Sequence, residues 1–136
     1  MFAVWVVSVV ATLGSLFFSD VMGLPPCVLC WYQRVCMYPL VVIATVALIT
    51  RDRRATRYAW PFGIAGLVVS SYHSLLYYAV LPANIAPCAT GVSCTERQIE
   101  WFGVVTIPLL SVAAFVSIVG CLLWCGVRLR EVGHDQ

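Results

Sequence analysis

Two pairs of cysteines have the residue type and spacing of a dithiol–disulfide site. Cys27 and Cys30 are separated by two residues, and Cys88 and Cys94 are separated by five. Paired thiols at short range can be oxidised to a disulfide and reduced again, so two such pairs could relay electrons from one to the other. The residues alone leave two other interpretations open, which are structural disulfides and a zinc site made of four thiolates.

The first pair lies where an apolar segment begins. It follows Pro25-Pro26, and proline is common in the first turn of a helix. Unpaired N–H groups and the positive end of the helix dipole stabilise a thiolate at this place. On a regular helix, however, residues i and i+3 have Cβ atoms about 5–6 Å apart, too far for a relaxed disulfide. A disulfide between Cys27 and Cys30 therefore requires a loosened first turn.

Arg34 and His73 are ionisable residues inside apolar segments. Arg34 follows Cys30 by four residues, which puts both on one helix face. An arginine inside a membrane span costs at least ~2.5–3.5 kcal/mol, so it marks a functional site by default. Residue counting puts Arg34 and His73 at a similar depth, roughly 12 Å from the outer ends of their segments. We expect them to form one polar layer beneath Cys30. The alternatives are that Arg34 extends to the lipid headgroups and that His73 makes an interhelical hydrogen bond.

Composition and periodicity predict the elements that carry these residues. The chain of 136 residues is 62% hydrophobic and 10% charged, and this composition argues against a soluble domain. The small net charge of +2 argues against nucleic-acid binding. Four apolar runs are each long enough to cross a bilayer. We therefore predict a single all-α domain over residues 1–136, an up-down-up-down four-helix membrane bundle with spans at about 1–18, 27–49, 58–81 and 101–125.

The arginines predict the orientation of this bundle. The connector 50–57 and the tail after residue 126 contain six of the eight arginines, so this side is expected to be cytoplasmic, with both termini. The outer loops, about 19–26 and 82–100, then place both cysteine pairs on the oxidising face. These loops contain no histidine, which disfavours a zinc site there. Cys36, Cys121 and Cys125 lie within the spans and are expected to be core-filling residues.

A family resemblance supports the redox interpretation. The first motif, Cys27-Val-Leu-Cys30-Trp-Tyr-Gln-Arg34, resembles the Cys-Val-Leu-Cys-x-Tyr-x-Arg signature of the DsbB family of disulfide-bond-formation proteins. The second, Pro87-Cys88-Ala-Thr-Gly-Val-Ser-Cys94-Thr, is similar to the shorter BdbC branch from Gram-positive bacteria. The resemblance covers essentially the whole chain. It implies a thiol:quinone oxidoreductase of the bacterial cell membrane that reoxidises a DsbA- or BdbD-like thioredoxin-fold thiol oxidase.

The same resemblance implies roles for individual residues. Cys88 would form the mixed disulfide with the partner, and Cys94 would pair transiently with Cys27. Cys30 would react with the quinone, for which menaquinone is favoured over ubiquinone, with Arg34 beside it. His73 is expected to contribute to the same cofactor site. A vitamin-K-epoxide-reductase-like oxidase and a non-catalytic membrane protein with two structural disulfides remain the alternatives.

Overall fold

The computed structural model describes residues 1–23, 25–52, 54–78, 80, 100–101 and 105–134. Cys88 and Cys94, with most of the predicted second outer loop, lie outside these residues. The predictions for this second pair therefore remain predictions. The first pair, Arg34 and His73 all lie within the described part of the chain.

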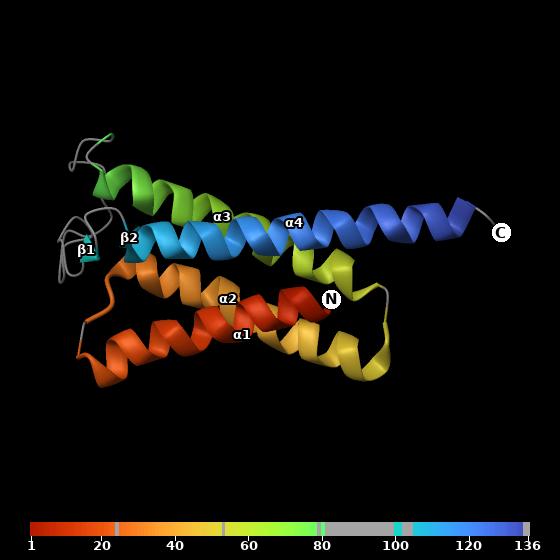
Figure 1. Cartoon of the computed structure of the whole chain (residues 1–136), viewed down its shortest axis with the longest axis horizontal. Coiled ribbons are helices and arrows are strands. Elements are labelled where there is room, and N and C mark those ends of the chain that lie inside the picture. The colour runs from red at the N-terminus through yellow and green to blue at the C-terminus, as the bar shows by residue number, and fades with distance from the viewer. Residues whose placement is uncertain (24, 53, 79, 81–99, 102–104, 135–136) are drawn as a thin grey trace.

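The described residues form the predicted all-α bundle. Helix α1 (Phe2–Leu16) continues into one π-helical turn, η1 (Phe17–Val21), and is followed by α2 (Val28–Thr50), α3 (Ala55–Tyr77) and α4 (Ile107–His134). The helices alternate in direction, so the α1–α2 connection lies at one end of the bundle. The α2–α3 connector and both termini lie toward the other end (Figure 1). The arginine-rich connector and the Cys27–Cys30 pair are thus at opposite ends.

Within the described residues, three helical segments are long and apolar enough to cross a membrane: Phe2–Val21, Val28–Thr50 and Ile107–Arg128. Helix α3 contains most of the predicted third span. It is as long as α2, with 23 residues, but is not among these segments. Its buried face explains the difference, since it carries small and polar residues such as Gly63, Gly66, Ser70 and His73. Helix α3 packs between α2 and α4, so its polar groups face protein.

The fourth helix begins later than the sequence suggested. The predicted span 101–125 starts at Trp101, but Glu100–Trp101 (β1) and Val105–Thr106 (β2) form a short antiparallel ladder that pairs Trp101 with Val105. Aromatic and β-branched residues favour strands, which fits this ladder. Helix α4 starts at Ile107, where Pro108 fits the first turn of a helix.

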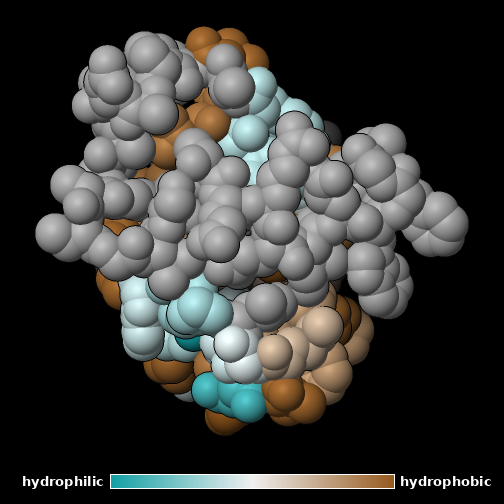
Figure 2. Space-filling view, turned by 90° about the vertical axis from the view of Figure 1, so that its left-hand side faces the viewer, coloured by the Kyte–Doolittle hydropathy of each residue, from teal (hydrophilic) through white to brown (hydrophobic). Residues whose placement is uncertain are grey.

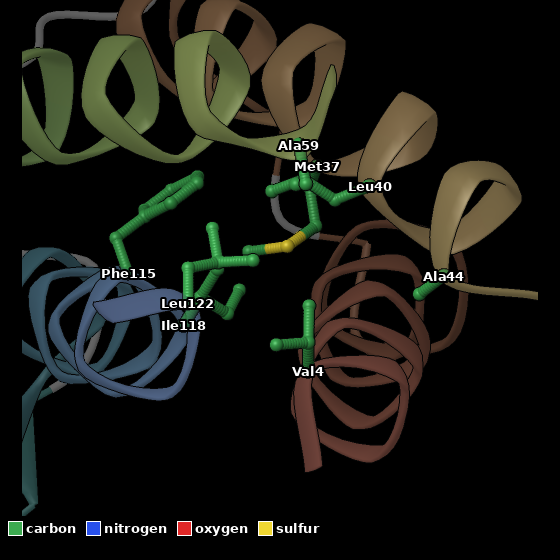
Figure 3. Close-up of a cluster of buried hydrophobic side chains, with 8 residues drawn as sticks. All are labelled: Val4, Met37, Leu40, Ala44, Ala59, Phe115, Ile118 and Leu122. Carbon is green, nitrogen blue, oxygen red and sulfur yellow. The ribbon is translucent and has the colours of Figure 1, made fainter. Parts of the chain in front are cut away.

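Side chains from all four helices meet in one apolar core (Figure 3). Phe115 of α4 is fully buried, and a Cβ atom added at Gly66 of α3 would overlap its ring. The helices can therefore approach closely because Gly66 has no side chain. The core cluster consists of Val4, Met37, Leu40, Ala44, Ala59, Phe115, Ile118 and Leu122.

Apolar side chains also cover the outside of the bundle. Exposed residues include Val10 and Leu13 of α1, Val42 of α2 and Leu123 of α4. Figure 2 looks onto the end of the bundle that carries Cys27 and shows brown, hydrophobic side chains around its edge. An apolar outer surface over an apolar core is what a bundle surrounded by lipid requires.

Candidate redox site at the start of α2

The first cysteine pair is close enough for its two sulfurs to react with each other. Cys27 is the N-cap of α2 and has an extended backbone, with φ −70° and ψ 168°, so it lies outside the helix. Cys30 lies in the first turn, and the two Sγ atoms are 3.0 Å apart. The separation expected for i and i+3 on a regular helix does not apply, because only one of the two residues is helical. Both cysteines carry free thiols.

The surroundings of Cys27 favour its thiolate. Cys27 precedes the apolar span, which begins at Val28. The hydrogen bond with the Cys30 thiol has the largest influence and lowers the pKa of Cys27 well below its ordinary value, while burial opposes this shift. His73 and the N–H of Cys30, which donates to Cys27 Sγ at 3.4 Å, lower it further. A helix start thus holds a preformed dithiol with one acidic thiol.

His73 of α3 completes this side of the site. Its Nε2 atom lies 3.8 Å from Cys27 Sγ, and its Nδ1 atom lies 3.1 Å from Nε2 of Gln33. His73 is only 3% exposed, so the contact with Gln33 fixes its ring in a site nearly closed to solvent. Gln33 belongs to the first motif, but sequence reasoning gave it no role. The contact between Gln33 and His73 depends on the register between α2 and α3, which cannot be deduced from a single sequence.

Arg34 points toward a different helix. Its Nε donates to Ser15 Oγ at 2.9 Å, and its Nη2 donates to Ser15 O and Ser19 Oγ, both at 2.7 Å. Its guanidinium also lies over the Trp31 ring, 5.5 Å from the centroid. These partners are neutral and Arg34 is 8% exposed, so a positive charge is held inside the protein without a paired carboxylate among them.

Arg34 and His73 therefore do not share one hydrogen-bonded layer in the described residues. Successive residues of a helix point about 100° apart, and this rotation turns Gln33 toward His73 while it turns Arg34 toward α1. Helix α3 also ends at Tyr77, four residues before the predicted end of the third span, so His73 lies about 6 Å closer to the helix end than residue counting implied. Ser15 and Ser19, spaced i and i+4 in an apolar run, were the signal in the sequence that would have revealed the partner of Arg34.

Cys30 and Arg34 line a cavity of about 470 Å³ between α1, α2 and α4. Its wall is mostly apolar and includes Phe115, whereas His73 is not among the described residues that line it. Thr12 also lines the cavity, and its Oγ1 atom is buried without a hydrogen-bond partner. A cavity of this size can hold a small organic molecule, and its few polar groups would orient that molecule.

The other described cysteines are not among the residues that line this cavity. Cys36 and Cys121 pack against the apolar core, as expected for core-filling residues. Cys125, near the end of the apolar part of α4, accepts a hydrogen bond from the amino group of Met1, with N and Sγ 3.4 Å apart. This contact links the start of α1 to α4 at the end of the bundle opposite Cys27.

Comparisons with known proteins identify the family of the chain. The sequence model of the family "Disulfide bond formation protein DsbB" matches residues 1–125. The chain is 44% identical over 125 residues to Disulfide bond formation protein C of Bacillus subtilis, a match that covers 90% of this chain and 91% of the relative. It is 42% identical over 123 residues to Probable disulfide formation protein C of Halalkalibacterium halodurans, covering 90% of each.

Similarity also extends to a Probable disulfide formation protein of Metapseudomonas resinovorans, 44% identical over 115 residues, which are 84% of this chain and 80% of the relative. No solved structure matches the chain. The family match spans nearly the whole chain, and it includes the cysteine pair, Gln33, Arg34, His73 and the cavity between α1, α2 and α4. The chain is therefore a disulfide-forming membrane protein and belongs to the DsbB family of disulfide bond formation proteins.

Proposed function

We propose that this protein is a thiol:quinone oxidoreductase that reoxidises an extracytoplasmic thioredoxin-fold thiol oxidase and passes the electrons to a membrane quinone. One observation carries the quinone part of this proposal. Cys30 and Arg34 lie in the wall of one apolar cavity. The Sγ atom of Cys27, which does not line the cavity, lies 3.0 Å from the Sγ atom of Cys30. A dithiol is thus joined directly to a space suited to a lipid-soluble reactant.

The cavity fits a quinone ring. A quinone is flat and largely apolar, with two carbonyl oxygens that accept hydrogen bonds and gain negative charge on reduction. The buried Thr12 hydroxyl has no hydrogen-bond partner, and Arg34 supplies a fixed positive charge. Such preorganised groups stabilise developing charge most strongly where water is excluded. A quinone held by these residues would supply an oxidant for two electrons and two protons.

The protein's own residues supply the matching half of this exchange. When Cys27 and Cys30 form a disulfide, the pair loses two electrons and two protons, which balances reduction of the quinone. Cys30 faces the cavity, while His73 faces Cys27 and can hold or move a proton there. Arg34 stays in position because Ser15 and Ser19 hold its guanidinium.

The second pair would connect this site to the partner protein. By resemblance to the family, Cys88 forms the mixed disulfide with a DsbA- or BdbD-like oxidase, and Cys94 pairs transiently with Cys27. This role requires both pairs to face the extracytoplasmic side of the cell membrane. The concentration of arginines in the connector 50–57 and in the tail after residue 126 of the sequence supports that orientation.

Purified full-length protein, a reduced BdbD-like partner and a soluble quinone analogue would test the proposal. We expect stoichiometric quinone reduction and partner oxidation, followed by quinone absorbance and by thiol labelling. Cys30→Ser and Cys88→Ser should each abolish turnover, whereas Cys36→Ser should retain it. Full turnover in either of the first two variants would refute the relay. Pairs that stay oxidised throughout turnover would instead identify structural disulfides.

A further inference from the structure

We infer that the reduced Cys27–Cys30 pair and His73 form a binding site for a thiophilic divalent cation, with Zn²⁺ as its natural probe. The two Sγ atoms and a ring nitrogen of His73 all lie within 4.8 Å of one another. Two thiolates and one imidazole are a ligand set that zinc accepts, with a fourth position open to water. The inference concerns binding to this cluster and does not depend on a quinone or a partner.

The geometry is already close to that of a tetrahedral site. Zinc–sulfur bonds of ~2.3 Å and zinc–nitrogen bonds of ~2.0–2.1 Å place two sulfurs about 3.8 Å apart and sulfur and nitrogen about 3.6 Å apart. In the protein the sulfurs are 3.0 Å apart, and Cys27 Sγ is 3.8 Å from His73 Nε2. The remaining pair, Cys30 Sγ and the ring nitrogen of His73, lies within 4.8 Å. Shifts of about 1 Å would bring all three atoms to these separations. Cys27 lies outside the helix, so a shift of its Sγ atom changes the capping contact from the Cys30 N–H and leaves the helical residues of α2 in place.

The ligand that sequence reasoning did not find comes from α3. The absence of histidine from the predicted outer loops disfavoured zinc, but α3 brings His73 up to the start of α2. Helix packing thus joins a histidine from one span to two cysteines at the entry of another. Among the described residues, the cluster offers three ligands, and each contributes one ligand atom.

Gln33 is placed to orient the histidine ligand. Metal-bound histidine usually donates the N–H of its second ring nitrogen to a neighbouring acceptor. His73 Nδ1 lies 3.1 Å from the amide of Gln33. Rotation of that amide by half a turn would present its oxygen as the acceptor, which leaves His73 Nε2 unprotonated and free to bind the metal. Gln33 would then be a positioning residue for the metal site.

The site would exist only in the reduced protein. Binding of Zn²⁺ forms two zinc–sulfur bonds and displaces the protons that the two sulfurs still carry, with no change in oxidation state. A disulfide between Cys27 and Cys30 removes both sulfur ligands. Zinc and oxidation therefore compete for the same two atoms, and bound zinc would withdraw the pair from thiol exchange.

Metal titration of the full-length Cys88→Ser/Cys94→Ser protein in detergent, reduced with a non-chelating phosphine, would test the site. We expect one Co²⁺ per chain with the near-ultraviolet thiolate band and visible bands of a tetrahedral site, and displacement of Co²⁺ by Zn²⁺. Gln33→Leu should weaken Zn²⁺ binding about 10–100-fold, and His73→Ala should weaken it at least as much. Cys36→Ser should bind like the parent, and the oxidised protein should not bind.

X-ray absorption of the zinc-loaded protein identifies the ligands directly. Two sulfurs and one imidazole nitrogen per zinc are expected in the parent, and three sulfurs are expected in His73→Cys. The His73→Cys variant also tests the role of residue 73 if His73→Ala does not fold. A parent shell with no sulfur or with more than two sulfurs would overturn the inference. So would Zn²⁺ affinity that is unchanged in His73→Ala.

Discussion

Arg34 is the residue whose removal best separates the quinone half of the proposed reaction from the thiol half. It is 8% exposed and makes three hydrogen bonds at 2.7–2.9 Å, two to Ser15 of α1 and one to Ser19 of η1. Interhelical hydrogen bonds in membranes average about 0.6 kcal/mol, so Arg34→Ala should lose about 2 kcal/mol of bundle stability. Ser19 keeps acceptors in its own helix, which limits the loss. We expect the variant to fold.

The larger effect should fall on quinone affinity. One hydrogen bond from a charged donor contributes about 1.5–3 kcal/mol. Since about 1.4 kcal/mol is a factor of ten, Arg34→Ala should raise the KM for a quinone analogue about tenfold to a hundredfold. Arg34→Lys keeps the charge but cannot form the same planar contacts with Ser15 and Ser19, so its effect should be intermediate.

Two assays distinguish this effect from general damage. Steady-state quinone reduction at a fixed saturating concentration of reduced partner gives the KM, and single-turnover exchange with the partner gives the rate of the thiol step without quinone. Partner exchange should change less than threefold. Arg51→Ala, at an exposed position at the opposite end of α2, is the matched control. An unchanged KM in Arg34→Ala, or equal losses in both assays, would refute the reasoning and leave Arg34 a structural role.

Two further predictions follow from the cavity and the core. Thr12→Val removes the unpartnered hydroxyl at nearly constant volume. Because a neutral hydrogen bond contributes about 0.5–1.5 kcal/mol, we expect a two- to tenfold rise in the KM for quinone and unchanged thermal stability. No change in KM would show that the hydroxyl does not contact the ligand. Gly66→Ala would place a methyl group that overlaps the ring of the fully buried Phe115, so it should destabilise the protein by about 1–3 kcal/mol in thermal unfolding. Gly14→Ala, with open space around it, should not change the stability. Equal melting temperatures for the two variants would show that the core can repack.

The sequence predicted the helices well because the length of each apolar run determines them directly. The fold class and the closeness of Cys27 to Cys30 were accessible from the chain alone. Helix ends were less accessible. Trp101 was predicted to begin the fourth span but lies in a two-residue strand. The prediction missed this strand because hydropathy does not distinguish a strand from the first turn of a helix.

The contacts between helices could not be predicted, because they depend on rotation and register. Residue counting gave Arg34 and His73 a similar depth but did not show which helix each one faces. A shift of one residue along α2 turns a side chain by about 100° and so changes its partner from α3 to α1. Gln33 was therefore assigned no role, although it contacts His73 and lines the cavity.

This rotation gives the two sulfurs of one motif different surroundings. Cys27 is next to His73 and is not among the residues that line the cavity, whereas Cys30 lines the cavity with Arg34. An extended N-cap followed by a helical turn is what allows two adjacent thiols to face in different directions while they stay 3.0 Å apart. A relay needs this asymmetry, because one sulfur must exchange with another cysteine while the other reacts within the membrane. The same asymmetry places Cys27 beside His73, which supports the proposed metal site, while Cys30 faces the cavity proposed for the quinone.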